Sequence, residues 1–217
     1  MITFRTVAFS ALLAIVHSTP LLADSGSVFE LLEQGNTEAV SQVIKGDPAA
    51  LQARNASGDT LLLIAAREGD MKAVQMLLDA GADVNALNNS RRDILNIAVT
   101  TRNPELARMA LAAGADATMI TSVYEGSALI YGSAKGQDEI VEMLLAAGAP
   151  VDRVNNIGWT ALLEVVILGD GSGPYVRITK MLLDAGADKT IADKDGRTPL
   201  DHAKARGHHN LANLLSD

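Results

Sequence analysis

The chain has 217 residues, of which 48% are hydrophobic and only 3% aromatic, and it carries a formal net charge of -8. This apolar content argues against a disordered chain, and the acidic balance argues against a general nucleic-acid-binding surface, because phosphate binding depends on clustered Lys and Arg. The sequence contains no cysteine, which excludes disulfides and cysteine nucleophiles.

The first 23 residues, MITFRTVAFSALLAIVHSTPLLA, have the features of a secretory signal peptide. Arg5 precedes an apolar stretch at residues 7–16, which is too short to span a bilayer comfortably, and Pro20 follows it. A buried first helix is the alternative, but no polar face interrupts the stretch. We therefore expect cleavage after Ala23, a periplasmic or secreted location and no stable membrane anchor in the mature chain. Leu21 stands where small residues are preferred, which leaves the cleavage position open.

The remaining sequence repeats itself with a period near 33 residues. Glycines at the end of the recurring text LLDAG or a close variant are 33, 34 and 38 residues apart, at Gly81, Gly114, Gly148 and Gly186. A period of this length is typical of an array of stacked helix pairs. In the unit that contains Gly81, we expect a short helix from Thr60, a turn at Gly69 and a second helix at residues 72–79.

We expect a single domain at residues 24–217 that consists of six such units. The units are placed at residues 27–54, 55–87, 88–121, 122–154, 155–192 and 193–217. The first unit lacks the Gly-Ala ending and the last one stops after its second helix, so both are expected to cap the array.

Two segments carry a family resemblance. NASGDTLLLIAAREGDMKAVQMLLDAGADVNAL from Asn55 and DKDGRTPLDHAKARGHHNLANLL from Asp193 are similar to the ankyrin repeat at the expected offsets. The resemblance implies an all-α, elongated and curved solenoid of about six helix-turn-helix units with short β-turn fingers. The histidine that the family has in Thr-Pro-Leu-His is absent from every unit; its positions hold Leu63, Asn96, Ile130, Leu163 and Asp201.

Packing between the units is expected to bury the small and branched apolar side chains, such as Leu62, Ala65, Val74 and Leu77, where each larger residue contributes roughly 1.5–3 kcal/mol. The middle of the array departs most from the family pattern. It includes Gly132 inside a helix, which costs roughly 1 kcal/mol relative to Ala. We expect the middle to be the less stable part.

The fifth unit is longer than the others by five residues, which we place at residues 171–175, GSGPY. Because this segment contains Gly and Pro, it is predicted to form a loop between the two helices of the unit. A tolerated surface insertion is favoured over a functional loop. Tyr175 at the expected tip keeps the functional alternative open.

No catalytic constellation is recognised in the sequence. Asp201, His202, His208 and His209 gather near the C-terminus, but their spacing is loose for a metal site, and His208 occupies the structural Gly-His position of the family. We expect no enzyme activity, no metal and no cofactor.

Ankyrin-like arrays generally bind proteins through their turn tips and inner helices, and the resemblance implies this function here. The expected binding residues are exposed aromatic, apolar and basic side chains on that surface: Tyr124, Ile157, Trp159, Ile167, Leu168, Tyr175, Arg92 and Arg197. Trp159 is the only tryptophan of the chain. An equally weighted alternative is that the inserted segment covers Ile167 and Leu168, and that Trp159 packs beside them.

We therefore expect a monomeric, non-catalytic protein-protein interaction module that acts after export and binds another protein, but no nucleic acid. One alternative is an inhibitor or protective partner of an exported enzyme. A small-molecule or metal binder is less favoured, because the sequence reveals no polar groups that converge in a pocket.

Overall fold

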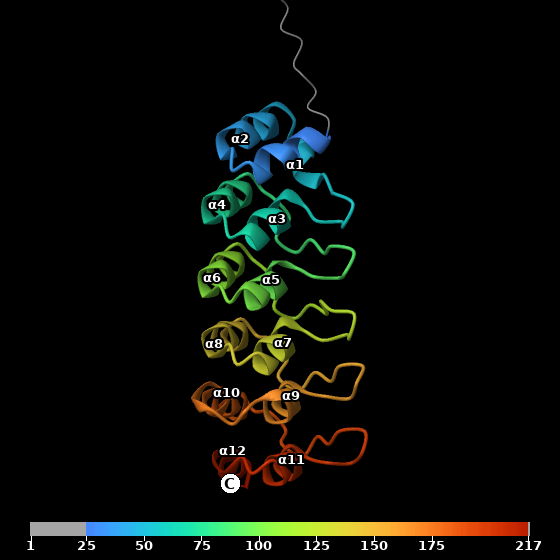
Figure 1. Ribbon diagram of the computed structural model, residues 1–217, viewed down its shortest axis with the longest axis vertical. Helices are drawn as coiled ribbons and strands as arrows, with labels where there is room; N and C mark the ends of the chain where they lie inside the picture. Colours follow the sequence, from blue (N-terminus) through green and yellow to red (C-terminus); the bar gives the residue numbers. More distant parts are fainter. Residues whose placement is uncertain (1–24, 217) are drawn as a thin grey trace, which may run out of the picture.

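The computed structural model describes residues 25–216, so the predicted signal peptide at residues 1–23 lies outside the described residues. Twelve α-helices form six antiparallel pairs that stack in a line, with a projecting turn, or finger, between successive pairs (Figure 1). Residues 25–216 contain no β-strand. The predicted all-helical solenoid of six helix pairs is confirmed.

The helices are α1 (Ser25–Glu33), α2 (Thr37–Gly46), the 3-10 helix η1 (Pro48–Gln52), α3 (Leu61–Glu68), α4 (Met71–Asp79), α5 (Ile94–Thr101), α6 (Pro104–Ala112), α7 (Ala128–Ala134), α8 (Asp138–Ala146), α9 (Ala161–Leu168), α10 (Gly173–Asp184), α11 (Pro199–Ala205) and α12 (His209–Ser216). The first helix of each pair lies next to the fingers, and we call α3, α5, α7, α9 and α11 the inner helices (Figure 1).

The same capping chemistry starts each inner helix. The hydroxyl of Thr60 accepts a hydrogen bond from the backbone N–H of Leu63 at 3.3 Å, which satisfies one of the free donors at the helix start. Ser127, Thr160 and Thr198 do the same at the starts of α7, α9 and α11. In α5 the cap is a carboxylate, Asp93. A recurring local signal therefore fixes where the inner helices begin.

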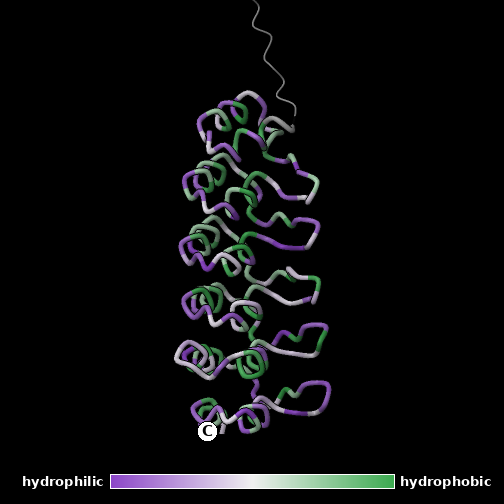
Figure 2. The backbone as a smooth tube through the Cα atoms, in the orientation of Figure 1, coloured by the Kyte–Doolittle hydropathy of each residue, from purple (hydrophilic) through white to green (hydrophobic). Residues whose placement is uncertain are grey.

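The core is a continuous column of apolar side chains between successive pairs. Leu62, Leu95, Leu129 and Leu162 occupy the same position of successive inner helices, and each is at most 1% exposed. Figure 2 shows the hydrophobic residues concentrated on the helices. The finger of the fourth unit, unlike the one before it, is also coloured hydrophobic at its tip (Figure 2).

Each finger closes on itself through one polar residue. In the fifth unit the Asn155 N–H donates to the Trp159 carbonyl oxygen at 3.0 Å, while Asn155 Oδ1 accepts from the Trp159 N–H at 2.9 Å. The fourth finger is longer by one residue, because its closing bond runs from the Thr121 N–H to the Gly126 carbonyl. Ser122 replaces the asparagine there and accepts from the N–H of Gly126.

The prediction that residues 171–175 form a loop is wrong in its second half. Helix α10 begins at Gly173 and has 12 residues, so Pro174 and Tyr175 lie in its first turn. Proline is tolerated there because the first N–H groups of a helix have no intrahelical acceptor. The insertion therefore lengthens a helix, and Tyr175 does not stand at the tip of a loop.

Candidate functional site

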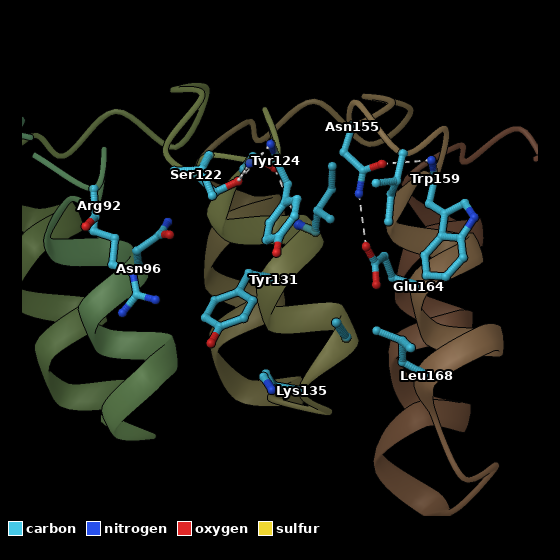
Figure 3. Close-up of a pocket in the computed structure, with 17 residues that line it drawn as sticks. Arg92, Asn96, Ser122, Tyr124, Tyr131, Lys135, Asn155, Trp159, Glu164 and Leu168 are labelled. Atoms are coloured by element: carbon cyan, nitrogen blue, oxygen red, sulfur yellow. Dashed lines mark hydrogen bonds between the residues drawn. The ribbon is translucent and has the colours of Figure 1, made fainter.

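A pocket of about 450 Å³ opens between the fingers and inner helices of the third, fourth and fifth units (Figure 3). Five of the eight side chains predicted to bind a partner line it, namely Arg92, Tyr124, Ile157, Trp159 and Leu168. The other three, Ile167, Tyr175 and Arg197, do not line it.

The rim of the pocket is apolar and open to solvent. Tyr124 and Val123 are each 62% exposed, and Leu168 on the last turn of α9 is 55% exposed. Ile157 in the next finger is 41% exposed, and Trp159 is half-buried. The inserted segment does not cover Leu168, so this part of the alternative interpretation is wrong.

Backbone hydrogen bonds set the relative position of the two fingers that carry this rim. The Asn156 N–H donates to the Tyr124 carbonyl oxygen at 2.9 Å, and Asn156 Nδ2 donates to the Val123 carbonyl at 3.3 Å. Asn89 makes the equivalent pair of bonds to the finger of the second unit. The position of Tyr124 relative to Ile157 is therefore fixed by the backbone.

The finger-to-finger ladder is interrupted where the pocket lies. Within residues 25–216, the finger of the third unit makes no backbone hydrogen bond to that of the fourth. One side-chain bond joins the two units here, from Arg91 Nη2 to the Ile120 carbonyl at 3.3 Å. The extra residue in the fourth finger shifts its tip out of register with the third, and the pocket spans this gap.

A buried carboxylate faces the pocket. Glu164 on α9 is 6% exposed and lines the pocket, and its Oε1 accepts a hydrogen bond from Asn155 Nδ2 at 3.0 Å (Figure 3). Burial raises the pKa of Glu164 to about 7, against the opposing effects of the Asn155 hydrogen bond and the positive charge of Lys135.

The sequence reasoning missed Glu164. The equivalent positions of the other inner helices hold Ile64, Ile97, Tyr131 and His202, so the position is not one where the repeat usually places a charge. The available signal was a single acidic residue inside the apolar run ALLEVVIL, since a charged residue is seldom fully buried unless it has a partner.

Two basic side chains, Arg92 and Lys135, also line the pocket, and both are exposed. Lys135 Nζ lies 5.5 Å from the centroid of the Tyr131 ring, a cation–π distance. Lys135 is near enough to lower the pKa of Glu164, but it forms no ion pair with it within 4 Å. The pocket thus combines one buried, oriented negative charge with two solvated positive ones.

The histidines near the C-terminus have a structural role. His202 Nε2 lies 2.7 Å from Asp193 Oδ2 and links the last finger to α11. Residues 25–216 contain no group of three or more His, Cys, Asp or Glu side chains that could hold a metal ion. In the same residues, no helix combines the length and apolar character that crossing a bilayer requires.

Comparisons with known proteins agree with this geometry. The family model described as ankyrin repeats (three copies) matches residues 29–121 and 129–217. The chain is similar to YahD of Escherichia coli strain K12, an ankyrin repeat protein by name, with 35% identity over 159 residues, which is 73% of this chain and 79% of YahD.

Two solved structures have the same fold. An ankyrin repeat domain from Acinetobacter baumannii AYE superposes with a TM-score of 0.83 at 39% identity, covering 89% of this chain and 97% of that one. The ankyrin repeat protein EF0377 superposes with a TM-score of 0.81 at 29% identity, covering 89% and 98%. Some relatives are far longer: Caenorhabditis elegans mask-1, an ankyrin repeat and KH domain-containing protein, is 29% identical over 87% of this chain but only 8% of its own length.

Proposed function

This chain belongs to the ankyrin repeat family, and from that premise we propose that it is a non-catalytic protein-binding module whose partner docks around the pocket of the third to fifth units. Ankyrin repeats are in general protein-protein interaction modules, and their fold is typically a non-enzymatic scaffold. The proposal adds the place on the array, the rim formed by Tyr124, Ile157 and Leu168.

The observation that carries the proposal is the exposure of these apolar side chains on a backbone whose position is fixed. Contiguous exposed apolar surface is uncommon on a soluble protein unless it is a binding site, and tyrosine and tryptophan are common anchors of interfaces. Because the fingers are held by backbone hydrogen bonds, the partner does not have to order them on binding, which favours affinity.

We further propose that the module acts after export, on the basis of the signal-like sequence of residues 1–23. An inhibitor or protective partner of an exported enzyme is a narrower form of the same function. N-terminal sequencing of the protein purified from its native cells tests the export step. A mature chain that still begins at Met1 would rule export by this route out.

Affinity capture from the native compartment tests the binding surface. The Tyr124→Ala, Leu168→Ala double variant should recover at least about tenfold less of the partner than the wild type does, because each truncated interface anchor typically costs on the order of 1–2 kcal/mol. Val154→Ala is the matched control, since Val154 is 47% exposed and does not line the pocket. Equal recovery by all three proteins would place the binding surface elsewhere.

A further inference from the structure

We propose that the pocket selects a basic side chain, lysine or arginine, from an extended segment of the partner protein, and that the cationic group pairs with Oε2 of Glu164 while the aliphatic part packs against Tyr124 and Ile157. The inference rests on the proposed function, because it names what the protein-binding surface selects.

Glu164 provides the charge that fixes the position of such a group. Its Oε1 is bound to Asn155 Nδ2, whereas Oε2 accepts no hydrogen bond from the residues in the described part of the chain. A carboxylate that is buried with a single neutral donor is poorly stabilised, which is the cause of its raised pKa. A cation in the pocket would supply the missing interaction, and its charge would be worth more there than at an exposed site.

The walls of the pocket suit the remainder of a basic side chain. Lysine and arginine carry a long aliphatic stem behind the charge, which packs on apolar surface. Tyr124 and Ile157 supply such surface at the entrance, beside Glu164. The ring of Tyr131 on α7 already lies 5.5 Å from an ammonium group, that of Lys135, so an aromatic face that attracts cations is present in the same pocket.

An anionic occupant is the competing possibility, because Arg92 and Lys135 line the pocket as well. Both are exposed side chains, and exposed, mobile charges contribute little to a specific ion pair. A negative group would also lie beside the buried carboxylate of Glu164 and would further disfavour its ionised form. Lys135 is better explained as an internal counter-charge that an incoming cation displaces.

The whole chain favours a basic partner in the same sense. Its formal net charge is -8, and a net negative protein attracts basic segments over distances longer than contact. This long-range attraction accelerates encounter, while Glu164 provides the local selection.

Four synthetic peptides test the inference: acetyl-Ala-Ala-X-Ala-Ala-amide with X as arginine, lysine, norleucine or glutamate. Trp159 is the only tryptophan and lines the pocket, so its fluorescence reports binding. The arginine and lysine peptides should bind at least about tenfold more tightly than the norleucine peptide, and the glutamate peptide most weakly. N-acetylarginine amide alone should bind more weakly than the arginine peptide; equal affinity would indicate a free small molecule and overturn the inference.

Two variants must shift the affinity of the arginine peptide in opposite directions. Glu164→Gln keeps the shape and the hydrogen bond to Asn155 but removes the charge, so it should abolish the preference for the basic peptides. Lys135→Met should strengthen their binding severalfold, because the internal competitor is removed. The reverse pattern, with a preference for the glutamate peptide, would mean an anionic occupant and overturn the inference.

The failure of this inference can be told apart from the failure of the proposed function. If partner capture depends on Tyr124 and Leu168 but Glu164→Gln captures as well as the wild type, the binding surface stands and the selection of a basic side chain is wrong. If none of the four peptides binds, the inference is also overturned. Only partner recovery that is indifferent to Tyr124 and Leu168 removes the proposed function itself.

Discussion

The side-chain amide of Asn155 donates a hydrogen bond to the carboxylate of Glu164 at 3.0 Å and thereby joins a finger to the inner helix that follows it. Asp193 and His202 make the same connection in the next unit at 2.7 Å, again between residues nine positions apart. Two consecutive units thus use one geometric solution with different chemistry. The finger that carries Ile157 and Trp159 owes its position to the first of these contacts.

Asn155→Ala should destabilise the protein. The substitution removes the donor to Glu164 and the side-chain acceptor of the Trp159 N–H, and it leaves two polar groups with fewer partners. The expected loss is roughly 1–3 kcal/mol in the free energy of unfolding, measured by urea denaturation. Asn213→Ala on the exposed face of α12 is the control and should change stability by less than about 0.5 kcal/mol. Equal effects of the two substitutions would contradict a role for this link.

Glu164 should make the stability of the protein depend on pH. Its pKa rises from 4.5 to about 7 on folding, so the folded state binds this proton more tightly than the unfolded state does. Stability contributed by the protonated form is present below the unfolded pKa and is lost as the pH rises through the folded one, that is, between about pH 4.5 and about pH 7. The melting temperature of Glu164→Gln relative to wild type should therefore be higher at about pH 8 than at about pH 5. A difference that is the same at both pH values would refute the burial of this carboxylate.

Asp93→Thr should stabilise the protein at neutral pH. Asp93 is 2% exposed and caps α5, where the other inner helices have Thr or Ser, and burial raises its pKa to about 6 from 3.8. Threonine can keep the hydrogen bond to the Asn96 N–H without a buried charge, so we expect a gain of roughly 1–3 kcal/mol. The gain should disappear below about pH 4, where aspartate is neutral in both states.

The reciprocal change is the control for this substitution. Thr60 caps α3 at the equivalent position and is 5% exposed. Thr60→Asp should lower the unfolding free energy at neutral pH, and it should do so less at acidic pH. If both substitutions destabilise to the same extent, the hydroxyl cap has no advantage over the carboxylate at these positions.

The repeat architecture could be predicted from the sequence because its determinants are local and recur. A Thr or Ser cap, a glycine turn and the spacing of Leu62 and its equivalents each act within one unit, and their repetition in several units makes the signal strong. The aromatic and apolar residues on the fingers could be found by the same alignment, since the family places variable positions there.

The pocket could not be predicted, because it depends on how neighbouring units lie relative to one another. One additional residue in the fourth finger moves Tyr124 out of register with the third finger, and no local pattern reports that shift. Glu164 was missed for a related reason, since its burial comes from contacts between units. The loop expected near Pro174 was wrong because proline was interpreted as a helix breaker, although it is compatible with a first turn.

Tyr175 should matter for stability rather than for binding. It packs against the preceding unit: its hydroxyl donates to the Ala134 carbonyl at 3.4 Å, and a Cβ placed on Gly136 would lie 3.0 Å from its ring. Tyr175→Ala should lower the unfolding free energy by roughly 2 kcal/mol or more, because it leaves a cavity between two units. Leu168→Ala, at an exposed position of the neighbouring helix, should cost less than about 0.5 kcal/mol. The opposite ranking in urea denaturation would restore Tyr175 as a binding candidate.

Arg102 should be a source of strain that a single substitution relieves. It ends α5 in the left-handed region at φ 53°, where the equivalent residue of α3 is Gly69 at φ 73°. A side chain at such a φ costs roughly 1–2 kcal/mol, whereas glycine adopts it freely. Arg102→Gly should therefore raise the unfolding free energy by roughly 0.5–1 kcal/mol, reduced by the greater entropy of glycine in the unfolded chain and by the loss of a positive charge near the helix C-terminus.

Arg102→Ala separates the backbone effect from that of the side chain. It removes the guanidinium group but keeps a Cβ in the left-handed region, so it should give none of the gain. Gly69→Ala provides the complementary test: nothing lies within 4 Å of a Cβ placed there, and a loss of roughly 1 kcal/mol would come from the backbone conformation alone. If Arg102→Gly and Arg102→Ala stabilise the protein equally, the strain resides in the arginine side chain and not in the positive φ.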